Sequence, residues 1–218
     1  MNVIILYISL LLIPVIILIS DSFVKTKYTK LKNNRVITGC EVAHDILDNK
    51  SFDSVYVVNN KQNLNFYDSN RKVIKLSDDV FDETTLYAVS VGIMKATEAV
   101  NDNKKNKMMH FRDSLKDIIP MINLLSYILF IVGVLVNIGI CEVALALLIL
   151  VLIYNVFIFK YEDKVKALAL KLIKGEGYID KEERCDVEKI MSSYRFHGFD
   201  EMITSIMNIL DALIPDSR

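Results

Sequence analysis

The chain contains no tryptophan, only three cysteines, and almost no net charge. Its 26 Lys and Arg against 27 Asp and Glu give a formal charge of -1 over 218 residues, which argues against a basic nucleic-acid binder and against an acidic disordered tail. The cysteines Cys40, Cys141 and Cys185 lie far apart and without CxxC spacing. Neither a zinc knuckle nor a disulfide framework is therefore expected.

Charge is also absent from two long stretches. Residues 1 to 20 carry none, and between Ile118 and Phe159 the only formally charged side chain is Glu142. Such runs are typical of transmembrane helices, because crossing about 30 Å of hydrocarbon at 1.5 Å per residue takes roughly 20 residues. The second stretch is too long for one span, and Asn, Gly and Glu cluster at 137–142. With 52% hydrophobic residues, the sequence predicts an α-helical membrane protein with a hairpin at 118–159.

The first apolar run has two alternative interpretations. A cleaved signal peptide has a basic region before its apolar core, whereas here only Met1 and Asn2 precede the run. We therefore expect an uncleaved anchor over residues 1–20. Pro14 is tolerable within it, because neighbouring helices can satisfy the freed carbonyl.

The basic residues predict the orientation in the membrane. Every Lys and Arg lies either between residues 21 and 117 or after residue 159. Under the positive-inside rule both regions are cytoplasmic, and the N-terminus and the loop around Glu142 are outside. The expected organisation is an anchor at 1–20, a cytoplasmic α+β unit at 21–117, the hairpin at 118–159 and a cytoplasmic helical region at 160–218.

The segment 21–117 combines helix and strand signals. Thr38 followed by Glu41 predicts a capping box and a short helix. Three β-branched or aromatic stretches then alternate with turn-forming residues and predict a three-stranded meander: Ser54–Val58, Leu64–Tyr67 and Lys72–Leu76. A second helix is expected from Glu83 to Val100, with Asp82 as its N-cap.

Four stretches resemble a known family in order and spacing. They are TGCEVAHDIL from Thr38, FYDSNRKVIKLSDDVF from Phe66, PMINLLS from Pro120 and KYEDKVKAL from Lys160. The family is the YugP-like neutral zinc metallopeptidases of bacterial membranes, and the resemblance covers most of residues 24–215. It implies a zincin-like unit of helix, meander and motif helix, and it implies that the protein is located in the bacterial cell membrane.

In that family the helix after the meander carries HExxH, where two histidines on one helix face bind zinc and the glutamate is the general base. Aligned by the flanking Ala-Val pairs, Met94 and Glu98 replace the histidines and Lys95 replaces the base. The family's third ligand aligns with Lys160. A thioether is a poor ligand for Zn(II), and an ammonium group cannot accept a proton. Glu98 is the only plausible remnant ligand, so neither bound zinc nor any other cofactor is expected.

Other residues do not restore the motif. His44, His110 and His197 are the only histidines, and no two are spaced i,i+4. Phe66 replaces a histidine that is common in the family. The chain also lacks a P-loop and a GxSxG motif.

The resemblance therefore implies a catalytically inactive homologue that acts as a membrane-bound binding or regulatory protein. The expected partners are the lipid bilayer and another membrane protein or an active peptidase paralogue, but no nucleic acid. The alternative is an active membrane zinc metallopeptidase with an atypical site.

Two interpretations of Glu98 stay open. A buried carboxylate needs a counter-charge, which Lys95 or Lys160 could supply where zinc is lost. Alternatively, Lys95 and Glu98 form an ordinary exposed i,i+3 pair, and Lys160 extends toward the membrane interface. A separation of more than about 6 Å between Glu98 and both ammonium groups would exclude pairing.

The C-terminal part is predicted to be helical. The third span is expected to continue to Lys174 and end at Gly175 and Gly177, and Asp180–Ser193 is charged with a helical pattern. One apolar stripe follows, broken by acidic residues: Met202, Ile203, Ile206, Met207, Leu210, Leu213 and Ile214. This amphipathic helix either packs on the cytoplasmic unit or lies on the membrane or a partner.

Overall fold

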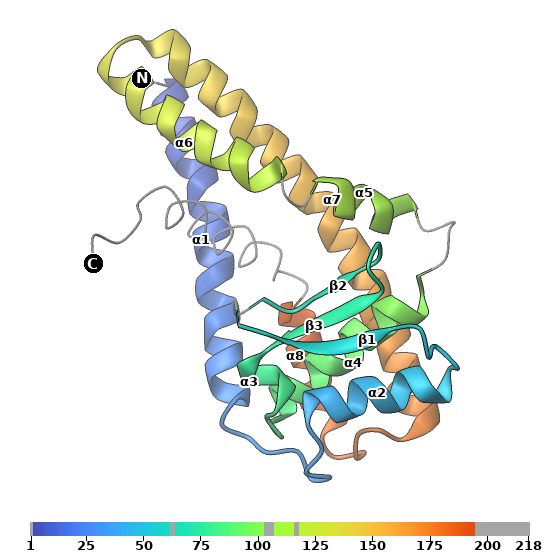
Figure 1. The fold of residues 1–218 in the computed structure, drawn as a ribbon. Coiled ribbons are helices and arrows are strands. Elements are labelled where there is room, and N and C mark those ends of the chain that lie inside the picture. Colours follow the sequence, from blue (N-terminus) through green and yellow to red (C-terminus); the bar gives the residue numbers. More distant parts are fainter. Residues whose placement is uncertain (1, 62–63, 103–106, 116–117, 195–218) are drawn as a thin grey trace, which may run out of the picture. The chain divides into compact units, whose positions relative to one another are not determined.

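The computed structural model describes residues 2–61, 64–102, 107–115 and 118–194. They are mostly helical and fall into two compact units (Figure 1). Unit 1 contains residues 1–19 and 114–159, and unit 2 contains residues 20–113 and 160–195. The predicted amphipathic helix at 202–214 lies outside the described residues.

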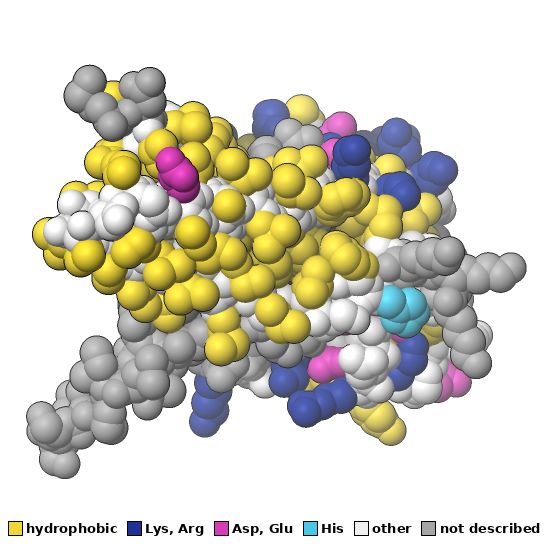
Figure 2. Space-filling view, turned by 90° about the horizontal axis from the view of Figure 1, so that it is seen from above, with side chains coloured by type: hydrophobic (Ala, Val, Ile, Leu, Met, Phe, Trp, Pro, Cys, Tyr) yellow, Lys and Arg dark blue, Asp and Glu magenta, His cyan; other side chains and the backbone are white. Residues whose placement is uncertain are grey.

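Three long apolar helices supply unit 1: all of α6 (Ile118–Leu135), and the parts of α1 (Asn2–Tyr28) and α7 (Ile138–Glu176) that lie before residue 20 and before residue 160. All three are long and apolar enough to cross a membrane. Many large hydrophobic side chains of these helices are exposed, and hydrophobic side chains cover much of the face that Figure 2 shows. Because exposed apolar patches of this extent are rare in soluble monomers, the helices indicate association with membrane lipid.

A ring stack and two hydrogen bonds join the three helices of unit 1. The Tyr7 ring on α1 stacks on Phe130 of α6 with centroids 3.9 Å apart, and its hydroxyl lies 2.9 Å from Ser126 Oγ. Ser126 in turn donates to the Ala144 carbonyl of α7 at 2.9 Å. The hairpin turn lies between Leu135 and Ile138, at the start of the predicted break.

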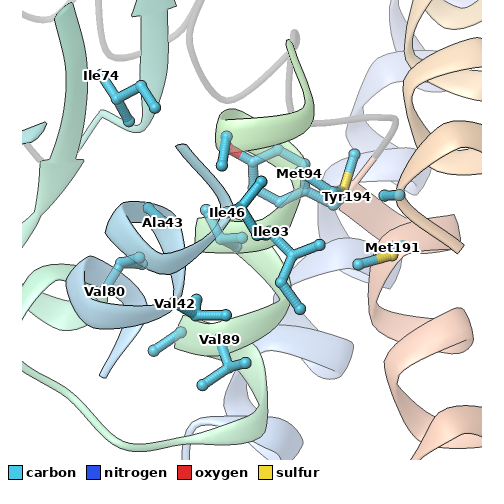
Figure 3. Close-up of a cluster of buried hydrophobic side chains, with 14 of the residues drawn as sticks. Val42, Ala43, Ile46, Ile74, Val80, Val89, Ile93, Met94, Met191 and Tyr194 are labelled. Carbon is cyan, nitrogen blue, oxygen red and sulfur yellow. The ribbon is translucent and has the colours of Figure 1, made fainter. Parts of the chain in front are cut away.

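Unit 2 has its core around α4 (Leu86–Val100), which is buried on almost every face. Side chains of α2 (Gly39–Asn49) pack on one face of α4, and those of α8 (Arg184–Tyr194) pack on the opposite face (Figure 3). The predicted capping box of α2 is confirmed: Thr38 Oγ1 accepts from Glu41 N–H at 3.1 Å, and Glu41 accepts from Thr38 N–H at 2.7 Å.

The sheet is mixed, so the predicted meander is wrong. Its strands are β1 (Tyr56–Asn60), β2 (Phe66–Asp68) and β3 (Val73–Ser77) in the order β1-β3-β2, and β1 runs parallel to β3. Asn65 Oδ1 accepts from Ser77 N–H at 2.8 Å, which holds the connection after β1 at the end of β3. In this sheet β1 and β2 lie on opposite sides of β3, and the antiparallel strands β2 and β3 form a hairpin.

The start of α4 also differs from the prediction. Asp82 is not the N-cap of α4, because it lies at the C-terminal end of a short helix, α3 (Asp78–Phe81). Thr85 caps α4 instead, its hydroxyl accepting from Ala88 N–H at 3.1 Å. The remaining helix of unit 2 is α5 (Lys107–Leu115), which the sequence did not predict.

Candidate functional site

Helix α4 places the degenerate motif inside unit 2. Met94 is fully buried and packs among apolar side chains near Tyr194 (Figure 3). Lys95 and Glu98 are one helical turn apart on α4, and both are buried, with 1% and 0% of their surface exposed. The Lys95 ammonium lies 3.0 Å from Glu98 Oε1.

This contact decides between the two interpretations of Glu98. The pairing hypothesis is confirmed for Lys95, because the two groups form a buried hydrogen-bonded ion pair. The interpretation as an exposed surface pair is wrong. Lys160 is exposed on α7 and is not the partner of Glu98 within the part of the chain that the structure describes.

Further charges converge on this pair from two other helices. Arg112 of α5 places Nη1 3.3 Å from Glu98 Oε1, and Glu162 of α7 places Oε1 3.9 Å from both Lys95 Nζ and Arg112 Nη1. Asp113 Oδ1 accepts from Arg112 Nη2 at 3.1 Å. We call Lys95, Glu98, Arg112, Asp113 and Glu162 the charged cluster.

Aromatic and polar groups enclose the charged cluster. Arg112 lies over the Tyr161 ring, with Cζ 5.0 Å from the centroid, and donates to the Tyr67 carbonyl of β2 at 3.2 Å. Lys95 Nζ lies 5.1 Å from the centroid of the Tyr194 ring. Ser69 donates its hydroxyl proton to Asp113. The charged groups of Lys95 and Arg112 are therefore surrounded by aromatic rings and by carboxylate or carbonyl oxygens in place of water, as buried charges require.

The neighbouring charges favour the ionised forms of Glu98 and Arg112, although both side chains are buried. Burial alone would raise the pKa of Glu98, but the charges of Lys95 and Arg112 outweigh it and lower that pKa. Burial would lower the pKa of Arg112, whereas Glu98 and the other acidic neighbours raise it well above its usual value. Within the described residues, Glu98 Oε2 and the Tyr161 hydroxyl are buried without a hydrogen-bond partner.

The remaining residues singled out in the sequence lie elsewhere. Phe66 is half-buried on β2, with the Lys75 ammonium 5.3 Å from its ring centroid. His44 and His110 are exposed on α2 and α5. His197 falls outside the described residues.

The residues at the motif positions do not fit zinc. Across the described ranges, no group of three His, Cys, Asp or Glu side chains is arranged to hold a metal ion. The donor chemistry agrees, because Met94, Lys95 and Glu98 offer a thioether, an ammonium and one carboxylate, whereas zinc prefers imidazole, thiolate or carboxylate ligands. The Glu98 carboxylate also already faces two cations.

Sequence reasoning missed Arg112, Asp113 and Glu162. For Glu162 a signal existed, because it lies three and seven residues before the apolar Val165 and Ala169, which mark the buried face of α7. Lys160, two residues earlier, falls on the opposite face. For Arg112 and Asp113 no local signal was available.

Comparison with known proteins agrees with the resemblance seen in the sequence. The model of the family described as "Putative neutral zinc metallopeptidase" matches residues 3–215, nearly the whole chain. The chain belongs to this family. That Met94, Lys95 and Glu98 stand at the family's motif positions stays a prediction from the flanking residues.

A relative supports the same assignment. The chain is 23% identical over 186 residues to the "Putative membrane protease YugP" of Bacillus subtilis (strain 168), covering 84% of this chain and 83% of that protein. No solved structure matches. The family membership and the apolar helices together support a membrane location.

Proposed function

We propose that this chain is a non-catalytic, membrane-bound member of its family that acts as a binding or regulatory protein. The observation that carries the proposal is the buried Lys95 ammonium, 3.0 Å from Glu98, at the position where the sequence predicts that the family has its general base. Family membership alone does not imply retained activity, because function depends on the site.

The chemistry of hydrolysis supports this proposal. A zinc-bound water needs a nearby base that accepts its proton, and a cationic ammonium has no lone pair to do so. A zinc ion beside Glu98 would also lie next to Lys95 and Arg112, whose charges repel it. Met94, Lys95 and Glu98 therefore supply neither a set of zinc ligands nor the general base.

The same proposal includes a topology. Residues 1–20 and 118–159 would span the bacterial cell membrane, with the N-terminus and Glu142 outside and residues 21–117 and 160–218 in the cytoplasm. The complete absence of Lys and Arg from the spans and the outer loop supports this orientation. The helices and sheet around α4 would form the zincin-like unit.

The partners follow from the same proposal. The bilayer is one, and another membrane protein or an active peptidase paralogue is the candidate protein partner. No residue pattern favours nucleic acid, since the net charge is -1.

Hydrolysis of an unstructured protein substrate such as labelled casein tests the proposal. The full-length chain in detergent, supplied with zinc, should cleave no faster than its Glu98→Ala variant. A variant that restores the motif and third ligand (Met94→His, Lys95→Glu, Glu98→His, Lys160→Glu) shows how the assay responds to an intact motif. Zinc-dependent cleavage by the parent chain, lost in Glu98→Ala and on chelation, would instead establish an active peptidase with an atypical site.

A further inference from the structure

Strand β1 lies at an edge of the sheet, with β3 on one side and no strand of the described residues on the other (Figure 1). Tyr56 donates its N–H to the Lys72 carbonyl at 3.1 Å, and the parallel register turns the backbone groups of Val58 toward β3 in the same way. Because alternate residues of a strand direct these groups to opposite sides, the N–H and C=O of Val57 and Asn59 point away from β3. Within the described ranges, no hydrogen bond joins them to another element.

This edge also lacks the usual protection against pairing. Natural edge strands commonly carry Lys or Pro, or contain a bulge. The sequence of β1 is YVVNN, and its register with β3 is continuous. On the face away from the core it exposes Tyr56 and Val58, with 66% and 37% of their surface accessible. Aromatic and β-branched residues favour strand pairing, so β1 has the character of a strand that pairs.

We infer that β1 is an interaction surface for the β1 strand of a second copy of this chain. The two strands pair antiparallel about a two-fold axis beside Val58, which joins two three-stranded sheets into one. In this register Val57 of each copy faces Asn59 of the other, so the outward N–H and C=O of both residues gain partners. The inference goes beyond the proposed function, since it does not depend on whether the chain binds zinc.

The side chains along β1 suit this symmetric pairing. The two Val58 residues would face each other as a non-hydrogen-bonded pair, in which the Cα atoms are about 4.5 Å apart. Tyr56 of each copy would lie diagonally across from Val58 of the other, within reach of an aromatic ring. Lys61 follows β1, and its two copies would lie at opposite ends of the pair, so like charges do not meet.

Membrane association favours a second copy over a soluble peptide as the partner. Pairing of two short strands buries much less than the roughly 1,600 Å² of a standard interface. The apolar helices of unit 1 indicate that every copy is held at a membrane. Confinement to the same membrane raises the effective concentration of one copy around another, so a small interface is sufficient.

Disulfide crosslinking of the full-length chain in isolated membranes tests the predicted register. Val58→Cys is introduced into a background with Cys40→Ser, Cys141→Ser and Cys185→Ser, and the membranes are treated with a mild oxidant. A disulfide needs Cα atoms about 4.4–6.8 Å apart, which the facing pair satisfies, so we expect about half of the chain or more to migrate as a dimer. A reductant should return it to the monomer.

Tyr56→Cys in the same background is the matched control, because this position is more exposed than Val58 but does not face itself. Its two copies would be separated by four residues along the pair, roughly 13 Å. Since this exceeds the reach of a disulfide, we expect less than about a tenth as much dimer.

Asn59→Pro, added to Val58→Cys, tests the backbone pairing. It removes an N–H that points away from β3, and proline is tolerated at such edge positions. The disulfide-linked dimer should fall to the level of Tyr56→Cys. The Tm of the reduced protein, measured by circular dichroism, should match that of Val58→Cys without the proline.

The chain without substitutions in β1 gives an independent measurement. Copies carrying a donor or an acceptor fluorescent protein at the C-terminus are reconstituted together in lipid vesicles. Energy transfer should be at least about twice that of the Asn59→Pro chain at the same density, because only the unsubstituted edge keeps its copies paired.

Several results would overturn the inference. Crosslinking might be equal for Val58→Cys and Tyr56→Cys, persist with Asn59→Pro, or link Val58→Cys to a different protein. Energy transfer that does not change with Asn59→Pro would also contradict pairing through β1, whether or not the cysteine variants fold. Failure of any of these tests leaves the zinc and peptidase assays of the proposed function unaffected.

Discussion

Lys95 and Glu98 are buried inside unit 2, where each faces the other and a further opposite charge. Replacing Lys95 by Met keeps the length and removes the charge, which leaves Glu98 with Arg112 as its nearest counter-charge. We expect Lys95→Met to lower the free energy of unfolding by about 3–5 kcal/mol, the usual effect of breaking a buried pair from one side.

Circular dichroism at increasing temperature measures this effect, since the chain has no tryptophan to report unfolding by fluorescence. Adding Glu98→Met to Lys95→Met should recover most of the stability, because replacing both partners by apolar groups of similar size is often nearly neutral. A Lys95→Met variant as stable as the parent chain would argue against the pair.

The sequence predicted part of this site. It offered Lys95 as one of two possible partners of a buried Glu98, and the structure shows that pair. Arg112 and Glu162 reach the same carboxylate from helices distant in sequence, and no local pattern encodes such a contact. Lys160 was named as the other possible partner from the alignment, which does not report which face of α7 is buried.

Among the elements, α2 and α4 approach closely through two glycines. A Cβ on Gly92 would collide with the Gly39 carbonyl, and a Cβ on Gly39 would lie 2.8 Å from the Ala88 carbonyl. We expect Gly92→Ala to destabilise the protein by about 1–3 kcal/mol, because backbone atoms cannot move aside cheaply.

Gly175→Ala is the matched control for this prediction. A Cβ there meets no atom within 4 Å, and the residue lies near the end of α7. Its substitution should raise stability by about 0.5–1 kcal/mol through helix propensity. Equal Tm values for the two alanine variants would contradict the close approach of the helices.

The capping box of α2 gives a prediction at the same scale. Thr38→Ala removes the acceptor for Glu41 N–H and should lower the free energy of unfolding by about 1 kcal/mol. Glu41→Gln keeps a side-chain oxygen for Thr38 N–H and should change stability much less. Comparing the Tm of the two variants measures the difference, and a larger loss for Glu41→Gln would be inconsistent with the box.

Local signals explain which elements were predicted. Thr38 and Glu41 identified the start of α2, and the near-absence of charged side chains from two long stretches identified the three long helices. The strand order was not predictable from turn residues, because the parallel pairing of β1 with β3 joins strands that are not neighbours in the sequence. The N-cap of α4 was misplaced because Asp82 lies at the C-terminal end of α3 and Thr85 caps α4.

At the scale of the whole molecule, the proposed topology places α8 in the cytoplasm and Glu142 outside. Cys185 is exposed on α8, so a membrane-impermeant maleimide should label it only after the cells are permeabilised. In a variant with Cys185→Ser and Glu142→Cys, labelling should occur in intact cells. The labelled fraction is read by gel shift in a background with Cys40→Ser and Cys141→Ser. Labelling of Cys185 in intact cells would reverse the orientation.

The central claim is that the site of this family member has lost its metal, and zinc content tests it most directly. The full-length chain is purified in detergent, saturated with zinc, desalted and measured by elemental mass spectrometry beside Glu98→Ala. The account predicts near-zero zinc in both proteins. One zinc per parent chain, lost in Glu98→Ala, would contradict it and restore the active peptidase as the function to pursue.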